Sequence, residues 1–349
     1  MGWVVNKYVK IAGGLAVALV VLVIVGVGGI YMWATSATSA RLAVVYTPHT
    51  IDIPVPFPLS KSEIEALRAE KEAALGDLDP DAEPEDVLKG VDLDALAKER
   101  AIARGKHLVE ARFACVECHG RDFSGGVMVD DGAMGTWLGP NLTQGEGSRA
   151  KGFAIADWDR IVRHGVKKEG TAGIMPSEDF VGMSDRELSD IVVYIGTFSN
   201  VDNTVPAPTF GPIGTMLMAT AQLPLSAEHH ADYTEHITLP PQTEPTATFG
   251  KHLVQVCTGC HRADLSGGPI PIGPPDWPPA GNLTPHADGL EGWTFEQFDA
   301  LMTKGEKADG SELLEPMTLM MPYASEMTEV EMKALWAYLQ SLEAKPTGT

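Results

Sequence analysis

The sequence is poor in cysteine, with four in 349 residues, and all four lie within two short motifs. No cysteine is left for a disulfide, so the cysteine count by itself does not indicate a compartment. Basic residues are also few, since 26 Lys and Arg accompany 47 Asp and Glu and leave a net charge of −21. This balance argues against nucleic-acid binding and favours an acidic surface, or a basic partner. Outside the two motifs the chain lacks a candidate nucleophile, acid–base pair or organic-cofactor motif.

Both cysteine motifs have the pattern C-x-x-C-H. They consist of Cys115, Cys118 and His119, and of Cys257, Cys260 and His261. This pattern is the attachment signature of a c-type haem, in which two thiols form thioethers with the vinyl groups and the histidine becomes the proximal iron ligand. Two residues between the cysteines let both sulfurs reach one porphyrin edge from a single helical turn. The sequence therefore predicts two covalently bound haem c groups with their iron.

A C-x-x-C pair has two other common uses, as half of a zinc site or as a redox dithiol. A structural zinc site normally brings its ligand pairs much closer together in sequence than these two motifs lie. A redox dithiol does not require a histidine after both copies. Haem attachment is the favoured interpretation, and it predicts a location outside the bacterial cytoplasm, where c-type haem is attached.

An N-terminal apolar stretch predicts a membrane anchor. We assign residues 1–10 to a cytoplasmic stub and residues 11–34, which carry no charge, to a transmembrane helix. Lys7 and Lys10 before this helix place the N-terminus in the cytoplasm and the remainder of the chain in the periplasm. A cleaved signal peptide is the alternative, although its apolar region is normally shorter, roughly 7–15 residues.

The rest of the chain divides by composition, because Pro-rich and acidic segments separate regions of helical periodicity. The predicted parts are an extended arm and acidic spacer at 35–91, a first haem domain at 92–200, a Pro-rich connector at 201–245 and a second haem domain at 246–345.

The two haem domains are copies of one another. Gly-Lys-His-Leu-Val precedes each motif, Asn-Leu-Thr and Met-Pro follow it, and a capping box opens each final helix. The paired segments are 105–109 and 250–254, 141–143 and 282–284, 175–176 and 321–322, and 184–187 and 328–331. Apolar residues at helical spacing follow both capping boxes, so each domain is expected to end in a helix with one buried face.

The order of helix, haem motif, Asn-Leu loop, Met-Pro and terminal helix closely resembles class I cytochromes c. The resemblance implies a mainly α fold, with an N-terminal transmembrane helix followed by two tandem class I cytochrome c domains. It also implies that a backbone carbonyl in the loop at 139–142 accepts a bond from Nδ1 of the haem histidine. Asn141 and Asn282 of the two loops are therefore expected at the haem pockets. The second loop has Gly281 where the family has proline, and is expected to be less rigid.

The same family supplies the second iron ligand from a methionine ahead of the last helix, and Met175 and Met321 occupy that position. A proline follows each of them and favours extended geometry, so that the side chain can project from a loop toward the iron. Methionine also fills cores as a soft apolar residue, and the chain has 14 of them. The competing candidates are Met183 in the first domain, and Met317 and Met320 in the second.

Four further residues recur in the two copies. Trp158 and Phe298 are expected as walls of the haem pockets, but an ordinary core position predicts the same burial. His107 and His252 precede the two motifs, and we interpret them as packing or surface residues rather than iron ligands.

The connector contains a histidine cluster formed by His229, His230 and His236. A metal site is one interpretation of this cluster. A solvated polar loop is the preferred one.

More narrowly, the chain resembles the membrane-anchored cytochrome subunits of periplasmic alcohol, aldehyde and gluconate dehydrogenases. The shared features are Asn-Leu-Thr-Pro at 282–285, a glycine-bounded lead-in to Trp at 289–293, and Met-Pro-Tyr at 321–323. Those subunits usually carry three haem motifs, whereas this chain has two. The resemblance therefore implies the fold and an electron-transfer role, without the dehydrogenase partner.

The predicted function is single-electron transfer at the bacterial inner membrane, in or beside a larger respiratory or photosynthetic complex. Other membrane-bound redox proteins are the expected partners, and small residues such as Gly14 and Ala18 would let a partner transmembrane helix approach closely. One alternative is a dihaem enzyme of peroxidase or thiosulfate-oxidising type, which needs an iron with an open distal position. Another is a structural or assembly subunit, in which two haems would be idle.

Overall fold

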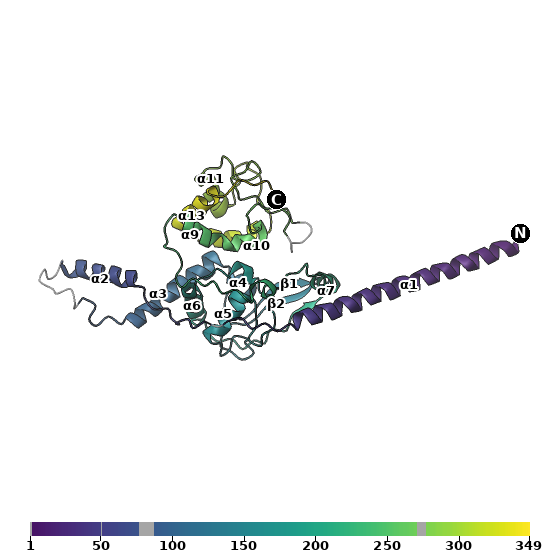
Figure 1. Ribbon diagram of the computed structural model, residues 1–349, viewed down its shortest axis with the longest axis horizontal. Helices are drawn as coiled ribbons and strands as arrows, with labels where there is room; N and C mark the ends of the chain where they lie inside the picture. Colours follow the sequence, from purple (N-terminus) through teal and green to yellow (C-terminus); the bar gives the residue numbers. More distant parts are fainter. Residues whose placement is uncertain (1, 50, 77–86, 271–276) are drawn as a thin grey trace.

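The computed structural model describes residues 2–49, 51–76, 87–270 and 277–349. One long N-terminal helix, α1 (Gly2–Leu42), extends away from two small helical bodies (Figure 1). The mainly α fold class is confirmed, with an apolar N-terminal helix followed by two helical domains.

The first domain surrounds the first C-x-x-C-H motif. Its elements are α3 (Leu93–His107), the π-helical turn η2 (Leu108–Arg112), α4 (Cys115–His119), β1 (Gly126–Asp131), β2 (Gly135–Gly139), α5 (Ile155–His164), the 3-10 turn η3 (Ser177–Asp179) and α6 (Asp185–Ile195). The segment before it contains α2 (Lys61–Gly76), and the segment after it adds β3 (Thr209–Phe210), α7 (Pro212–Ala219) and α8 (Ala227–His230). The strands form an antiparallel sheet in the order β1-β2-β3, which the sequence did not predict.

The second domain repeats the helical part of this plan. Its elements are α9 (Ala247–Leu253), the 3-10 turn η4 (Val254–Cys257), α10 (Thr258–His261), α11 (Phe295–Lys304), α12 (Met317–Ala324) and α13 (Glu329–Gln340). The first and last helices cross closely in both domains, because a glycine lies at the crossing. A Cβ atom on Gly105 of α3 would lie 2.1 Å from the carbonyl oxygen of Asp190, and one on Gly250 of α9 would lie 1.9 Å from that of Ala334.

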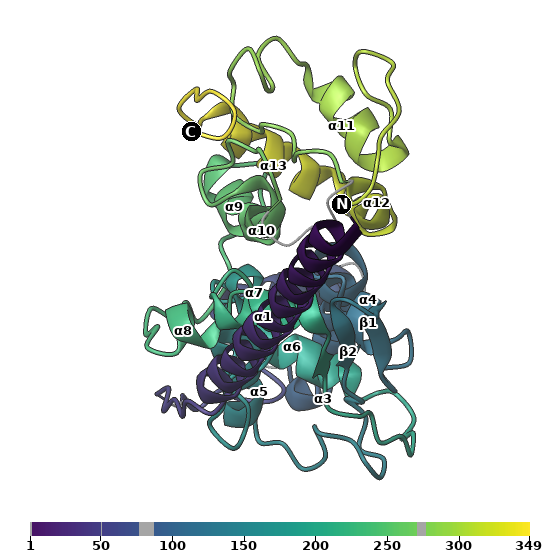
Figure 2. The same cartoon turned by 90° about the vertical axis from the view of Figure 1, so that its right-hand side faces the viewer.

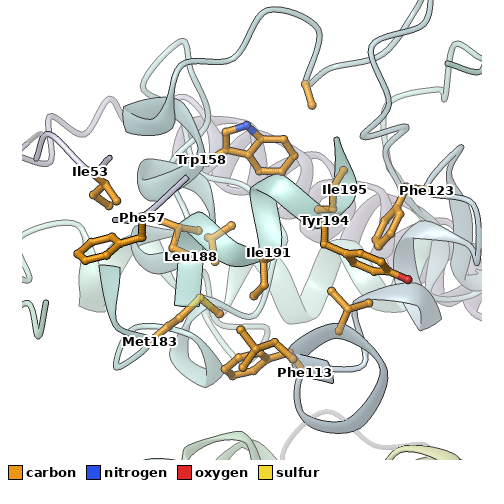
Figure 3. Close-up of a cluster of buried hydrophobic side chains, with 14 residues drawn as sticks. Ile53, Phe57, Phe113, Phe123, Trp158, Met183, Leu188, Ile191, Tyr194 and Ile195 are labelled. Carbon is orange, nitrogen blue, oxygen red and sulfur yellow. The ribbon is translucent and has the colours of Figure 1, made fainter. Parts of the chain in front are cut away.

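The core of the first domain includes residues that come from outside it in sequence. Ile53 and Phe57 of the predicted arm are buried in the same apolar cluster as Trp158 and Leu188 (Figure 3). Ser189 Oγ also donates to the carbonyl of Pro54 at 2.6 Å. The arm before α2 is extended, as predicted, and it packs on the first domain. Most of the predicted acidic spacer, at residues 77–86, lies outside the described residues.

α1 is long and apolar enough to cross a bilayer, judged by length and composition. An 18-residue window of it has a mean hydropathy of 2.7, and none of that window is buried by the rest of the described chain. The helix projects from the first domain in Figure 1 and is seen from its N-terminal side in Figure 2. A signal sequence near an N-terminus has the same properties. The helix continues past residue 34, where the arm was predicted to begin, and ends at Leu42.

Polar contacts explain why the last turns of α1 remain helical. Thr38 Oγ1 donates to the carbonyl of Thr215 at 3.1 Å, so α1 rests on α7. The Arg41 guanidinium donates to the carbonyl of Met218 at 2.7 Å and pairs with Glu228 at 2.5 Å. The end of the apolar helix is therefore fixed on the first domain.

The predicted connector is also more ordered than its proline content suggests. Met218, Leu223 and Leu225 are buried in a third apolar cluster with Trp137 of β2 and Val166. The middle of this segment therefore packs on the first domain.

Candidate functional site

Each C-x-x-C-H motif forms one short helical turn at the end of a longer helix. α4 holds Cys115 and Cys118, whereas in the second domain Cys257 ends η4 and Cys260 lies in α10. None of the four cysteines forms a disulfide. Burial raises the pKa of Cys115 and of Cys257 to about 12. A reactive redox dithiol has a lowered thiol pKa, so these environments argue against disulfide exchange.

The two proximal histidines are oriented in the same way. His119 Nδ1 lies 3.0 Å from the carbonyl oxygen of Pro140, and His261 Nδ1 lies 2.7 Å from that of Gly281. Only a protonated Nδ1 can donate to a carbonyl, so Nε2 of each ring keeps its lone pair. Burial lowers the pKa of both histidines, which favours the neutral, metal-binding form. The residues present therefore fit a haem c in each domain, and the glycine in the second loop does not remove the accepting carbonyl.

Asn141 and Asn282 hold these carbonyl loops in place. The Asn141 carboxamide accepts from the backbone and hydroxyl of Thr143 at 2.9 and 2.8 Å, and donates to the carbonyl of Val201 at 2.7 Å. Asn282 makes the equivalent bonds with Thr284 and with the carbonyl of Lys345. The structure thus places both residues beside the proximal histidines, where they act through the loop backbone.

The pocket residues predicted from the duplication lie in the two cores. Trp158 is buried in the apolar cluster that also contacts Cys115, and Phe298 is buried in the cluster that contacts Cys257. Met175 packs against the first of these clusters from the turn before η3, as the loop prediction requires. Met183, its competitor, is a fully enclosed core residue of the same cluster.

The second methionine differs from the prediction in its local structure. Met321 lies inside α12, and Pro322 follows it within the helix, so the expected extended geometry is absent there. α12 begins at Met317 and continues to Ala324, so both Met321 and Pro322 lie within it. Met321 lines an open cavity of about 460 Å³, while Met320 is 40% exposed.

The two domains meet through reciprocal histidine–glutamate bonds. His252 Nε2 of the second domain lies 2.9 Å from the Glu187 carboxylate of the first, and His107 Nε2 of the first lies 2.9 Å from the Glu331 carboxylate of the second. Both glutamates close the capping boxes that open α6 and α13, as the third residue of each helix. Equivalent residues of the two copies therefore exchange places, as in an isologous dimer interface.

Glu187 is the more deeply embedded of the two acids. Although burial opposes its ionisation, Arg112 at 2.7 Å and His252 hold the pKa of Glu187 far below its usual range. The sequence predicted His107 and His252 as packing or surface residues, and missed that they join the domains. Their recurrence together with the two capping glutamates was the available signal.

The attachment motifs themselves lie at this interface. The Tyr323 hydroxyl, two residues beyond Met321, donates to the carboxylate of Glu117 inside the first motif. Gly259 inside the second motif lies against Asp179, since a Cβ atom there would be 2.9 Å from Asp179 Oδ1. Burial and the neighbouring Glu178 carboxylate raise the pKa of Asp179 to about 7. Each motif thus contacts the segment that follows the methionine of the other domain.

Comparisons with known proteins agree with this architecture. Residues 247–343 match the family model for cytochrome c, and residues 100–195 match that for cytochrome c oxidase, cbb3-type, subunit III. The chain is 24% identical over 287 residues to the gluconate 2-dehydrogenase cytochrome c subunit of Pantoea cypripedii, covering 72% of this chain and 62% of that one. It is 24% identical over 257 residues to the alcohol dehydrogenase (quinone) cytochrome c subunit of Gluconacetobacter polyoxogenes, covering 66% and 54% of the two chains.

The same values are found for the alcohol dehydrogenase (quinone) cytochrome c subunit of Komagataeibacter europaeus. The chain spans between 54 and 62% of the length of these curated relatives. Two matched domains, each with an attachment motif and an oriented histidine, account for two haem groups. The chain is therefore a protein of two tandem cytochrome c domains.

Proposed function

We propose that this protein is a membrane-anchored dihaem cytochrome that carries single electrons between redox proteins on the periplasmic side of a bacterial inner membrane. The observation that carries this proposal is the reciprocal interface, which brings the two attachment motifs against each other's methionine segments. When bound, each haem supplies a one-electron iron couple whose potential depends on its axial ligands. Two such sites joined by a fixed interface suit electron exchange within one chain.

The chain's own residues would tune and shield these sites. His119 and His261 provide the proximal ligands, and Met175 and Met321 are the proposed distal ligands. A thioether ligand would raise the reduction potential relative to harder ligands. Trp158 and Phe298, both buried, would exclude water from the two pockets.

The anchor supports a position close to membrane complexes. Because Arg41 fixes the end of α1 on the first domain, the haem sites would stay near the bilayer surface. The relatives are cytochrome c subunits of dehydrogenases for gluconate and for alcohols, and we expect the electron donor to be a dehydrogenase that oxidises a small hydroxylated substrate. The net charge of −21 would steer a basic partner, with association that weakens as salt rises.

One observation favours a second candidate, a dihaem enzyme. Met321 lies in α12 and lines an open cavity. As a distal ligand, it would be easier to displace from the iron than Met175. A peroxidase or a thiosulfate-oxidising cytochrome would need such a displaceable ligand.

The two candidates are separated by turnover of the purified full-length protein in detergent. As a carrier it should be reduced and reoxidised rapidly by native membranes that oxidise alcohols or gluconate, and should not turn over peroxide or thiosulfate alone. Steady turnover of either compound, accompanied by a high-spin haem signal, would reject the carrier function in favour of the enzyme.

A further inference from the structure

Three histidines from separate parts of the chain meet beside the first domain. His49 comes from the arm after α1, His164 is the last residue of α5, and His236 comes from the connector. One ring nitrogen of each lies within 4.8 Å of the ring nitrogens offered by the other two. The ring centroids are 5.6 Å apart for His49 and His164, 4.6 Å for His49 and His236, and 5.8 Å for His164 and His236. The cluster considered from the sequence grouped His236 with His229 and His230 instead.

Hydrogen bonding leaves these rings incompletely satisfied. His164 is fully buried, and its Nδ1 donates to the carbonyl of His230 at 2.7 Å, so its Nε2 keeps a lone pair. Among the described residues, that Nε2 and the Nδ1 atoms of His49 and His236 are buried without a hydrogen-bond partner. Buried polar atoms in native proteins nearly always have a partner, so the unpartnered Nε2 of the fully buried His164 in particular requires an explanation.

A purely structural histidine cluster explains only part of this arrangement. Nε2 of His49 and Nε2 of His236 lie 2.7 Å apart and share one proton. That bond satisfies one nitrogen on each ring and leaves His164 Nε2 unused. A cation in place of the shared proton would engage all three residues at once.

We propose that His49, His164 and His236 bind one divalent zinc ion. Three neutral imidazoles with a fourth position for water form a common zinc ligand set, whereas magnesium and calcium require oxygen ligands. In a tetrahedral site with bonds of about 2.0 Å, the ligand nitrogens lie about 3.3 Å apart, so the rings need to move by only a few tenths of an ångström to about 1 Å. The bond from His164 Nδ1 to a backbone carbonyl is the usual outer contact of a metal-bound histidine.

The charges around the cluster are compatible with a cation. Asp159 Oδ2 lies 3.8 Å from His164 Nε2, and Asp185 Oδ1 lies 4.0 Å from His236 Nδ1. Arg163 is the opposing charge, but it pairs with both aspartates, at 2.6 and 2.8 Å. Two carboxylates against one guanidinium leave the surroundings with a net negative charge.

The protonation of the rings also suits metal binding. Burial lowers the pKa of His164, and burial together with Arg163 lowers the pKa of His236. Neutral imidazole is the form that binds zinc.

The second domain has no copy of the site, because Lys304 stands where the first domain has His164. A zinc ion bound by these residues would join the arm after α1, α5 and the connector. None of the three histidines belongs to a haem attachment motif.

The test is a zinc titration of the full-length haem-loaded protein in detergent after treatment with a chelator. Zinc and iron are then counted by elemental mass spectrometry. We expect one zinc for every two irons, with affinity at least tenfold weaker in His164→Ala and His236→Ala. His229→Ala, an exposed histidine of the same connector, should bind zinc like the wild type.

Two measurements keep the result unambiguous. An unchanged haem absorption spectrum shows that a variant is folded, and His49→Ala, which alters only the arm, replaces His164→Ala if that variant fails to fold. Wild-type protein that binds no more zinc than the variants would overturn the proposal. So would binding of copper(II) at this cluster without binding of zinc, which would assign the site to another metal.

Discussion

At the residue scale, the chemistry of this protein depends on the two attachment histidines and on what holds them. Each donates its Nδ1 proton to a loop carbonyl, and the loop is held by an asparagine, Asn141 or Asn282. The sequence motif predicts the cysteines and histidines because thioether attachment needs that spacing. It does not reveal how the asparagines act, since their contacts are to backbone groups about sixty residues further along the chain.

The distal ligands are tested by substitution. Met175→Ala and Met321→Ala should each remove one haem's share of the sulfur-to-iron absorption band at the red end of the visible spectrum, because each deletes one thioether ligand. Met183→Leu, a change within the core, should leave the band intact. Should the band survive Met321→Ala and disappear in Met320→Ala, the neighbouring methionine is the ligand.

At the scale of elements, the terminal helices are the part of the fold that the sequence predicts best. The capping boxes at Ser184 and Thr328 are formed as expected, and the helices after them bury one face. The β1-β2 hairpin was missed because residues 126–139 lack strong alternation. Met321 was expected in a loop because the residue before a proline favours extended geometry, but α12 includes both Met321 and Pro322.

The helix crossings give a prediction at this scale. Gly105→Ala and Gly250→Ala should each destabilise their domain by about 1–3 kcal/mol or more, because the added Cβ would meet a carbonyl oxygen at 2.1 or 1.9 Å. Gly132→Ala, where a Cβ meets no atom within 4 Å, should leave stability almost unchanged. Denaturant unfolding followed by far-UV circular dichroism measures the free energy of unfolding of the three variants. Equal stability in all three variants would contradict the close crossing.

At the scale of the whole molecule, the duplicated domains associate through equivalent residues. The sequence shows the duplication, but association depends on which surfaces meet, and His107 and His252 gave no directional signal by themselves. The ordering of the arm and the connector was likewise missed, since proline-rich segments without periodicity do not show what they pack against. The arm and the connector, with the end of α1, attach the apolar helix to the first domain.

The interface gives a stability prediction. Glu187→Gln should destabilise the protein by about 3–5 kcal/mol at pH 7, because it leaves the buried Arg112 without its counter-charge. Glu331→Gln is the matched control and should cost less, since its partner His107 has a side chain that is 35% exposed and no arginine takes part. Thermal unfolding followed by haem absorption compares the two, and a larger loss in Glu331→Gln would contradict the asymmetry.

The same pair gives a pH dependence. The pKa of Glu187 is lower in the folded protein than its ordinary value of 4.5, so its contribution is complete above that pH and is lost as the pH falls through and below it. The stability difference between wild type and Glu187→Gln should therefore shrink on acidification below pH 4.5. A difference that stays constant from neutral pH into acid would mean that the carboxylate is not held ionised.

The central claim is that one chain holds two low-spin haems that each exchange a single electron. A spectroelectrochemical titration of the full-length protein, with the haem content fixed by intact mass, tests it most directly. We expect a mass with two haems and two one-electron transitions, both between low-spin states. A single transition, or a high-spin haem that persists through the titration, would contradict it.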